Sequence, residues 1–123
     1  RAKTLIDQRR EGFAIYSGDD ATARELILLG GDGDISVTAN VAPKLMSQMC
    51  SAALAGDAAL AAELDRKLKA LHRDLFVEAN PIPVKWAVAE LGLQENVLRL
   101  PMTPLSAEHR ERVRAAMRNA EII

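Results

Sequence analysis

The sequence predicts an α/β fold, namely the C-terminal portion of a (β/α)8 TIM barrel: its last two strands and their helices, followed by a C-terminal helical segment. Two short apolar runs alternate with helical patterns in the first third of the chain, as is typical of a parallel sheet covered by helices. The remainder has helical periodicity, so we expect a predominantly α chain. Two strands alone would leave sheet edges unpaired, whereas a barrel of about 250 residues would supply partners.

The N-terminal segment predicts a helix followed by a strand. Residues 2–10 place apolar side chains at helical spacing, and Gly12 is expected to close this helix. Residues 13–16 (Phe-Ala-Ile-Tyr) form an apolar run that ends at a Ser-Gly pair, which indicates a buried strand.

A second helix and strand follow. Asp19 or Asp20 is expected to cap a helix over residues 21–29, which stops at two glycines. Residues 35–38 (Ile-Ser-Val-Thr) are rich in β-branched side chains and predict the second strand.

Helices are expected throughout the rest of the chain. Pro43 suits the first turn of a helix that ends at Gly56, and Asp57 is placed to cap the next one. That next helix has the strongest periodic pattern, a leucine stripe predicted to pack internally. The stripe consists of Leu60, Leu64, Leu68, Leu71 and Leu75.

The last part of the chain predicts two more helices. Asn80-Pro81-Ile82-Pro83 resembles a helix start, and that helix is expected to reach Gly92. Pro101 and Pro104 indicate an extended connection, after which Ser106 opens the final helix. We divide the chain at residue 56: residues 1–56 form barrel strand–helix units, and residues 57–123 form the C-terminal helical segment.

Composition and charge exclude several classes of protein. The 123 residues are 49% hydrophobic and 27% charged, the balance of a globular protein, with a net charge of -1. This gives no footprint for nucleic acid, and no apolar run could span a membrane; we expect a cytoplasmic protein. Cys50 is the only cysteine and is expected to be a reduced core thiol. Because Arg1 opens the chain and the first methionine is Met46, we also expect a piece of a longer protein.

Three segments resemble the dihydrodipicolinate synthase family, within the superfamily of N-acetylneuraminate lyase and class I aldolases. The first is Ser17-Gly18-Asp19-Asp20 with Ile35-Ser36-Val37-Thr38-Ala39-Asn40, and the second is the run from Phe76 to Ala87, with its Asn-Pro-Ile-Pro-Val-Lys-Trp motif. The third is Leu98-Arg99-Leu100-Pro101-Met102-Thr103-Pro104. The resemblance runs essentially end to end.

The resemblance implies a lyase of lysine (diaminopimelate) biosynthesis that condenses pyruvate with L-aspartate 4-semialdehyde. A lysine forms a Schiff base with pyruvate in this family, and no position of this chain matches it or the other catalytic residues. The lysine would lie shortly before Arg1, so the chain alone is expected to be inactive. The family implies no cofactor and no metal, and its members are usually homotetramers.

Two residues match substrate-binding positions of the family. Gly18 resembles the glycine beside bound pyruvate, where a missing side chain lets substrate approach the backbone. Ile35 resembles the isoleucine whose main-chain carbonyl lines the site. Both follow or belong to predicted strands, at the end of a barrel where active sites lie.

Other residues admit a catalytic and a structural interpretation. Asp19 and Asp20 could be paired carboxylates for acid–base catalysis, but we favour helix capping. Lys85 could replace the Schiff-base lysine, but we favour a packing or solvent-reaching lysine on a helix. His72 and His109 stand alone on charged helix faces and are expected at the surface.

Two alternative functions stay open. Another pyruvate-dependent aldolase or lyase of the superfamily would share the barrel and the imine chemistry and use a different aldehyde. A non-catalytic helical module would act through binding alone. The aspartates around Gly33, Asp32 and Asp34, lack the further ligands of a calcium loop and predict no metal site.

Overall fold

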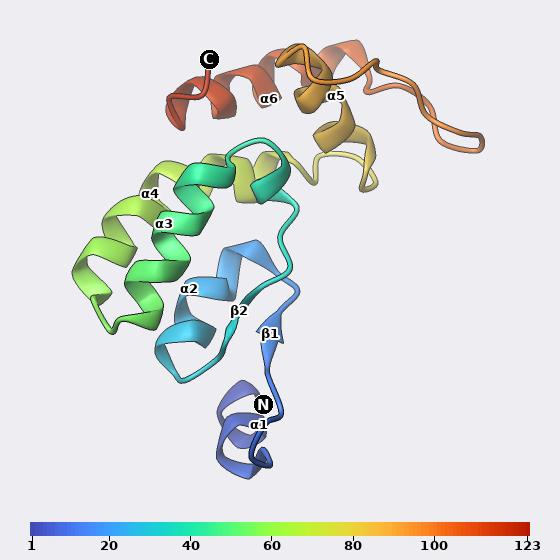
Figure 1. Cartoon of the computed structure of the whole chain (residues 1–123). Helices are drawn as coiled ribbons and strands as arrows, with labels where there is room; N and C mark the ends of the chain where they lie inside the picture. Colours follow the sequence, from blue (N-terminus) through green and yellow to red (C-terminus); the bar gives the residue numbers. More distant parts are fainter.

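A computed structural model describes all 123 residues as a curved, mostly helical molecule with one small sheet (Figure 1). The strands are β1 (Tyr16–Ser17) and β2 (Gly33–Asp34), and a short 3-10 helix, η1, spans Thr38–Asn40. The helices are α1 (Ala2–Gln8), α2 (Asp20–Leu28), α3 (Pro43–Leu54), α4 (Ala58–Asp74), α5 (Ile82–Glu90) and α6 (Ala107–Asn119). No helix combines the length and apolar character that crossing a bilayer requires.

The sheet consists of two parallel strands joined through α2. Tyr16 pairs with Gly33 and Ser17 with Asp34. Helix α2 packs on one face of this pair and is itself covered by α3 and α4, as Figure 1 shows. The predicted strand–helix–strand order is therefore confirmed.

Both strands are shorter than expected. Of residues 13–16 only Tyr16 lies in β1, while Phe13 is 66% exposed and lies outside it, so the predicted start of the strand and its burial are wrong. Residues 35–38 are not a strand either. The amides of Val37 and Thr38 donate to the Asp20 carboxylate, and the amide of Ala39 donates to Ser36. These side-chain acceptors replace a sheet partner, and the backbone turns into η1.

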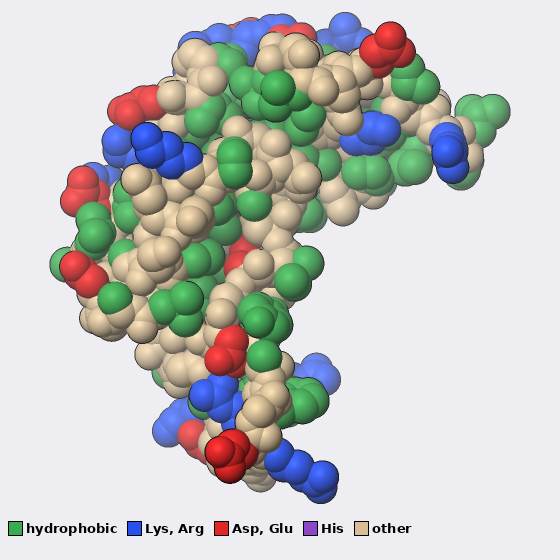
Figure 2. Space-filling model, in the orientation of Figure 1, with side chains coloured by type: hydrophobic (Ala, Val, Ile, Leu, Met, Phe, Trp, Pro, Cys, Tyr) green, Lys and Arg blue, Asp and Glu red, His purple; other side chains and the backbone are tan.

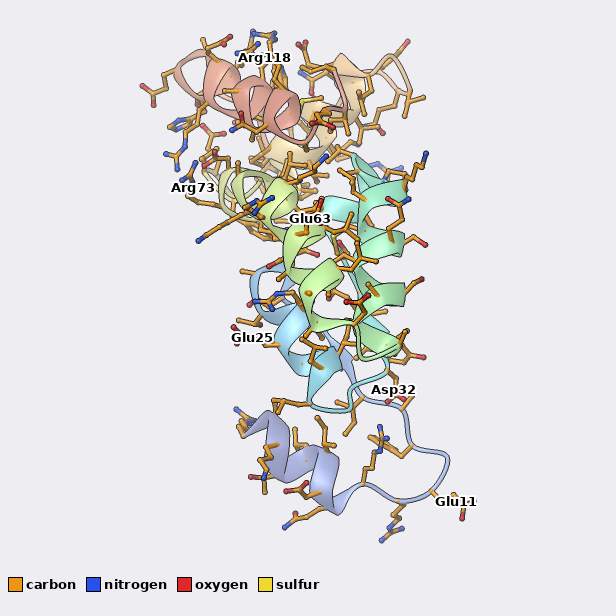
Figure 3. All side chains as sticks on the ribbon, turned by 90° about the vertical axis from the view of Figure 1, so that its left-hand side faces the viewer. Glu11, Glu25, Asp32, Glu63, Arg73 and Arg118 are labelled. Atoms are coloured by element: carbon orange, nitrogen blue, oxygen red, sulfur yellow. The ribbon has the colours of Figure 1, made fainter.

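The main hydrophobic core lies among the later helices. It contains buried side chains from α3, α4, α5 and α6, including Met49, Leu68, Trp86 and Met117. A smaller cluster of Ile27, Ala52, Ala53 and Ala61 joins α2 to α3 and α4. In the side view of Figure 3, α1 lies at one end of the molecule and α6 at the other.

The leucine stripe of α4 is confirmed over most of its length. Leu68, Leu71 and Leu75 are fully buried, and Leu64 packs against the core. Leu60 is 44% exposed because it lies in the first turn, near the edge of the packed face.

The predicted helix ends have mixed outcomes. The Asp57 carboxylate accepts from the amide of Leu60, which confirms its cap. Asp19 is at the N-cap position of α2, but its side chain accepts no backbone N–H there. Ser106 likewise begins α6 without a side-chain cap bond. Gly12 does not close α1, because that helix ends earlier, at Gln8, and Arg9 continues in extended conformation.

Charged side chains gather at the ends and along the outer edge of the molecule, as Figure 2 shows. The concave side in that view shows few charged side chains and several hydrophobic ones. Tyr16 is 54% exposed and Ile35 is 72% exposed. The sheet therefore has one face covered by helices and one face open.

Candidate functional site

The two predicted binding residues lie side by side at the carboxyl ends of the strands. Gly18 follows β1, and Ile35 follows β2 in parallel register. The amide of Ile35 donates to the carbonyl of Ser17 at 2.9 Å, which joins the two segments. A Cβ built on Gly18 would meet no atom within 4 Å, so packing in this chain does not require a glycine there. Substrate binding by these residues stays a prediction.

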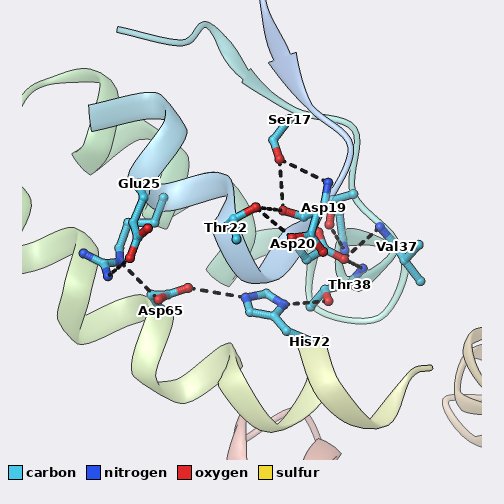
Figure 4. Close-up of polar contacts among 12 residues, drawn as sticks. Ser17, Asp19, Asp20, Thr22, Glu25, Val37, Thr38, Asp65 and His72 are labelled. Carbon is cyan, nitrogen blue, oxygen red and sulfur yellow. Dashed lines mark hydrogen bonds and ion pairs between the residues drawn. The ribbon is translucent and has the colours of Figure 1, made fainter. Parts of the chain in front are cut away.

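A Ser–Asp turn shapes the segment between β1 and α2. The Ser17 hydroxyl donates to the Asp19 carbonyl at 2.9 Å and accepts from the Asp19 amide at 3.1 Å. The Thr22 hydroxyl donates to the Asp19 carboxylate at 2.7 Å. Figure 4 shows these contacts at the start of α2. The Asp19 side chain thus stabilises the turn locally, and the start of α2 lies just beyond Gly18.

Asp20 connects the start of α2 to the segment after β2. Its side chain is buried, and its Oδ2 accepts from the amides of Val37 at 3.1 Å and Thr38 at 2.9 Å (Figure 4). These bonds satisfy backbone donors that no sheet neighbour reaches. Asp20 therefore neither caps its helix nor pairs with Asp19.

The acidic partner of Asp20 is Asp34, on β2. Burial raises the pKa of Asp34 to about 7, and the neighbouring, negatively charged carboxyl of Asp20 acts in the same direction. Burial would also raise the pKa of Asp20, but its polar neighbours Asp34, Ser36 and Thr38 outweigh burial and hold that pKa below its usual value. One carboxyl of the pair is thus ionised and the other titrates near neutrality.

His72 is buried beside this segment, so the expectation of a surface residue is wrong. Its Nδ1 lies 2.9 Å from the Thr38 hydroxyl, and its Nε2 lies 3.4 Å from Asp65. Asp65 also pairs with Arg24 of α2 at 3.1 Å. Figure 4 shows this series of contacts from α2 through α4 to η1. The neighbouring His72 ring and the Arg24 guanidinium lower the pKa of Asp65 despite its burial.

A spacing signal in the sequence could have located His72. It follows Leu68 by four residues and therefore lies on the packed stripe of α4. Asp65 is one turn before Leu68 on the same helix, which places a carboxylate near the ring. No comparable signal pairs Asp20 with Asp34, because their contact joins two different elements.

The remaining candidates have structural surroundings. Cys50 is a free, half-buried thiol, and burial, together with the charges of Asp34 and Asp20, raises its pKa. It is therefore protonated and poorly nucleophilic. Lys85 is half-buried on α5, where its ammonium makes no ion pair, and His109 lies near Glu78 and Glu108. No three His, Cys, Asp or Glu side chains group as metal ligands.

Comparison with known proteins gives consistent matches. The chain matches the model of the dihydrodipicolinate synthetase family over residues 1–120. It is 62% identical over 122 residues to the 4-hydroxy-tetrahydrodipicolinate synthase of Azoarcus sp., covering 99% of this chain and 42% of that protein. The enzyme of the same name from Thiobacillus denitrificans is 62% identical over 123 residues, covering 100% and 42%.

A solved structure agrees with these matches. The chloride-inhibited dihydrodipicolinate synthase of Acinetobacter baumannii, complexed with pyruvate, has a TM-score of 0.96 and 54% identity. The match covers 100% of this chain and 42% of that one. The chain spans about 42% of the length of each of these three relatives.

Proposed function

The chain belongs to the dihydrodipicolinate synthetase family, and from this premise we propose that it forms part of a 4-hydroxy-tetrahydrodipicolinate synthase. Such an enzyme condenses pyruvate with L-aspartate 4-semialdehyde in lysine (diaminopimelate) biosynthesis. In this proposal the chain contributes the last two strands of a TIM barrel and the terminal helices. Residues 1–56 belong to the barrel, and residues 57–123 form the helical segment beside it.

The observation that carries the proposal is the position of Gly18 and Ile35. They lie together at the carboxyl ends of two parallel strands, where barrel enzymes bind substrate. The space before Gly18 is open, and Ile35 is exposed. The similar Acinetobacter protein is complexed with pyruvate. We therefore assign these two residues to the wall that binds pyruvate.

The chain's own part in catalysis is to bind and orient. Gly18 would let pyruvate approach the backbone, and the main-chain carbonyl of Ile35 would face it. The Schiff-base lysine belongs to a part of the enzyme that precedes Arg1 in the family, so we assign no nucleophilic or acid–base step to these residues. We extend the proposal to a cytoplasmic homotetramer on the strength of family membership.

A chimera tests the proposal. The segment of the Thiobacillus enzyme that matches this chain is replaced by residues 1–123, and condensation of pyruvate with aspartate semialdehyde is measured. At 62% identity the replacement should pack correctly and retain activity. Borohydride should trap pyruvate on the chimera and give no adduct with the 123-residue chain alone. A well-folded chimera without activity, or one faster with a sugar-acid aldehyde, would contradict the proposal.

Gly18→Ala provides the specific test of the binding wall. Because a Cβ there meets no neighbour within 4 Å, the melting temperature of the 123-residue chain should not change. In the chimera, kcat/KM for pyruvate should fall at least about tenfold, equivalent to about 1.4 kcal/mol. Glu63→Gln is the control and should leave both quantities unchanged, because Glu63 is exposed on α4, makes no ion pair, and has nearly the helix propensity of glutamine.

A further inference from the structure

Three carboxyl oxygens behind the candidate binding wall are buried and meet no hydrogen-bond donor. They are Oδ1 of Asp20 and both oxygens of Asp34. Asp20 lies at the start of α2 and is only 3% exposed, while Asp34 ends β2. Buried polar atoms nearly always have partners, so this cluster needs an explanation.

A single proton provides that explanation. Two neighbouring carboxyls whose oxygens are buried cannot both stay ionised, because their charges repel and the unpartnered oxygens are not solvated. If Asp34 is protonated, its hydroxyl donates to Asp20 and two of the unpartnered atoms become partners. The negative charge then resides on Asp20, whose Oδ2 already accepts two backbone amides, from Val37 and Thr38.

We propose that Asp34 is a positioning residue that acts in its protonated form by holding Asp20 in place. Asp20 in turn holds the Val37 and Thr38 amides, and through them the backbone that follows Ile35. The proton shared between Asp34 and Asp20 thus keeps the two strand ends of the binding wall together. The consequence for pyruvate rests on the proposed function, whereas the shared proton does not.

The surroundings of the pair favour the protonated form. The titratable groups that act on Asp34 are Asp20 and Asp19 at the start of α2, and His72 on α4. The charges of Asp34 and Asp20 also act on Cys50 of α3, where they help to raise the pKa of its thiol. Cys50 and Asp34 line the same hollow, of about 220 Å³, beside Met46. Of these groups only His72 is basic, and its ring nitrogens face Thr38 and Asp65. No ion pair therefore holds Asp34 in its charged form.

The pair makes the wall sensitive to pH. The pKa of Asp34 is raised to about 7 in the folded chain, above the value of about 3.9 for an exposed aspartate. A carboxyl whose pKa is raised by folding stabilises the fold fully at pH values below its pKa in the unfolded chain. This contribution is lost as the pH rises through its pKa in the folded chain. Above about pH 7 two negative charges face each other, and the segment after Ile35 should loosen.

Titration of the 123-residue chain tests the shared proton directly. Thermal unfolding is measured from about pH 5 to about pH 8.5 for the wild type, Asp34→Asn and the control Asp7→Asn. The amide of the Asp34→Asn variant can donate at every pH, so its melting temperature should stay level, while the wild type and the control fall by about 4 °C or more relative to it. Asp7 suits the control because it is exposed on α1 and makes no ion pair. Parallel curves for the three proteins would overturn the proposal.

A second measurement uses the wild-type chain, so that the proposal stays testable if Asp34→Asn does not fold. The resonance of the side-chain carboxyl carbon of Asp34 is assigned through its covalent bonds in isotopically labelled wild-type chain. Its chemical shift should change with a midpoint near pH 7. Asp20 should remain ionised over the same range. An Asp34 resonance that titrates below about pH 5 would rule out the shared proton.

The chimera tests the effect on substrate. From about pH 6.5 to about pH 8.5, the KM for pyruvate of the wild-type chimera should rise severalfold relative to that of its Asp34→Asn form, while the ratio of their kcat values stays constant. A purely structural role would not produce a pH-dependent KM ratio, so a constant ratio would overturn the positioning role. An inactive chimera would contradict the proposed function alone, because the titration of the chain decides the shared proton.

Discussion

His72 lies on a helix rich in charge, yet its ring is buried between Thr38 and Asp65. Its Nδ1 faces the Thr38 hydroxyl at 2.9 Å, and its Nε2 faces the Asp65 carboxylate at 3.4 Å. The ring therefore joins α4 to η1. It also connects, through Asp65, to Arg24 on α2.

Replacing His72 should destabilise the chain. His72→Ala leaves the buried Thr38 hydroxyl without its partner and removes the 3.4 Å contact with Asp65, so the free energy of unfolding should fall by about 1–3 kcal/mol. Urea denaturation measures this. His109→Ala is the control, because His109 lies near the surface and contacts only two carboxylates, at 3.5 Å or more. Equal losses for the two variants would show that the buried contacts of His72 contribute nothing.

The surroundings of Asp74 lead us to expect that the folded chain loses stability in acid. It is 2% exposed and is held by Arg73 at 2.7 Å and by Arg112 of α6 at 2.8 Å. Burial opposes ionisation, but these two hydrogen bonds outweigh it and lower the pKa of Asp74. A carboxyl whose pKa is lowered by folding stabilises the fold at pH values above its pKa in the unfolded chain, which is about 3.9. This contribution is lost as the pH falls through its pKa in the folded chain.

Asp74→Asn tests this dependence. Between about pH 5 and about pH 2 the variant should lose less stability than the wild type, in a series of urea titrations at fixed pH. At neutral pH it should be the less stable of the two, because the charged bonds to Arg73 and Arg112 are weakened. A wild-type loss in acid that the variant reproduces in full would assign acid sensitivity to other groups.

At the scale of elements, α4 has the largest role in packing, since it contacts α2, α3 and α6. Leu68→Ala should lower the free energy of unfolding by about 2–5 kcal/mol, because it leaves a cavity in a fully buried position. The same change at Leu60, which is 44% exposed, should cost much less. Denaturant unfolding of both variants measures the difference, and similar losses would contradict the observed burial.

The caps of α4 and α2 form a matched pair. Asp57→Ala removes the bond to the Leu60 amide and should cost about 1 kcal/mol. Asp19→Ala removes no backbone cap bond and should cost less, because its carboxylate contacts only the Thr22 side chain. Thermal unfolding compares them. A larger loss for Asp19 would mean that its turn contributes more than the cap.

At the scale of the whole molecule, the chain exposes large apolar side chains and the outer edges of its two-stranded sheet. Such edges and patches favour association. The 123-residue chain should therefore associate as its concentration rises in light scattering. Phe13→Lys, which replaces an exposed apolar side chain with a charge, should reduce association, whereas the exposed change Glu63→Gln on α4, which alters the net charge equally, should not. A monomer at every concentration would contradict this.

Much of the helical structure was predictable because its signals are local. The leucine spacing of α4, the proline near the start of α3 and the cap at Asp57 each depend on a few neighbouring residues, and all three are confirmed. The strands were less predictable. A short apolar run does not reveal where its ladder ends, and here the Asp20 carboxylate takes the next two amides.

The sequence by itself determined the order of the elements and which side of α4 faces the core. It also determined the family resemblance, which agrees with the family match over residues 1–120. Only the tertiary structure decided that His72 is buried and that Asp20 pairs with Asp34 rather than with Asp19. The reason is distance along the chain. Asp20 meets Val37 across 17 positions, and His72 meets Thr38 across 34. Periodicity reports which side of an element is apolar, whereas packing alone decides which polar groups of different elements meet in the interior.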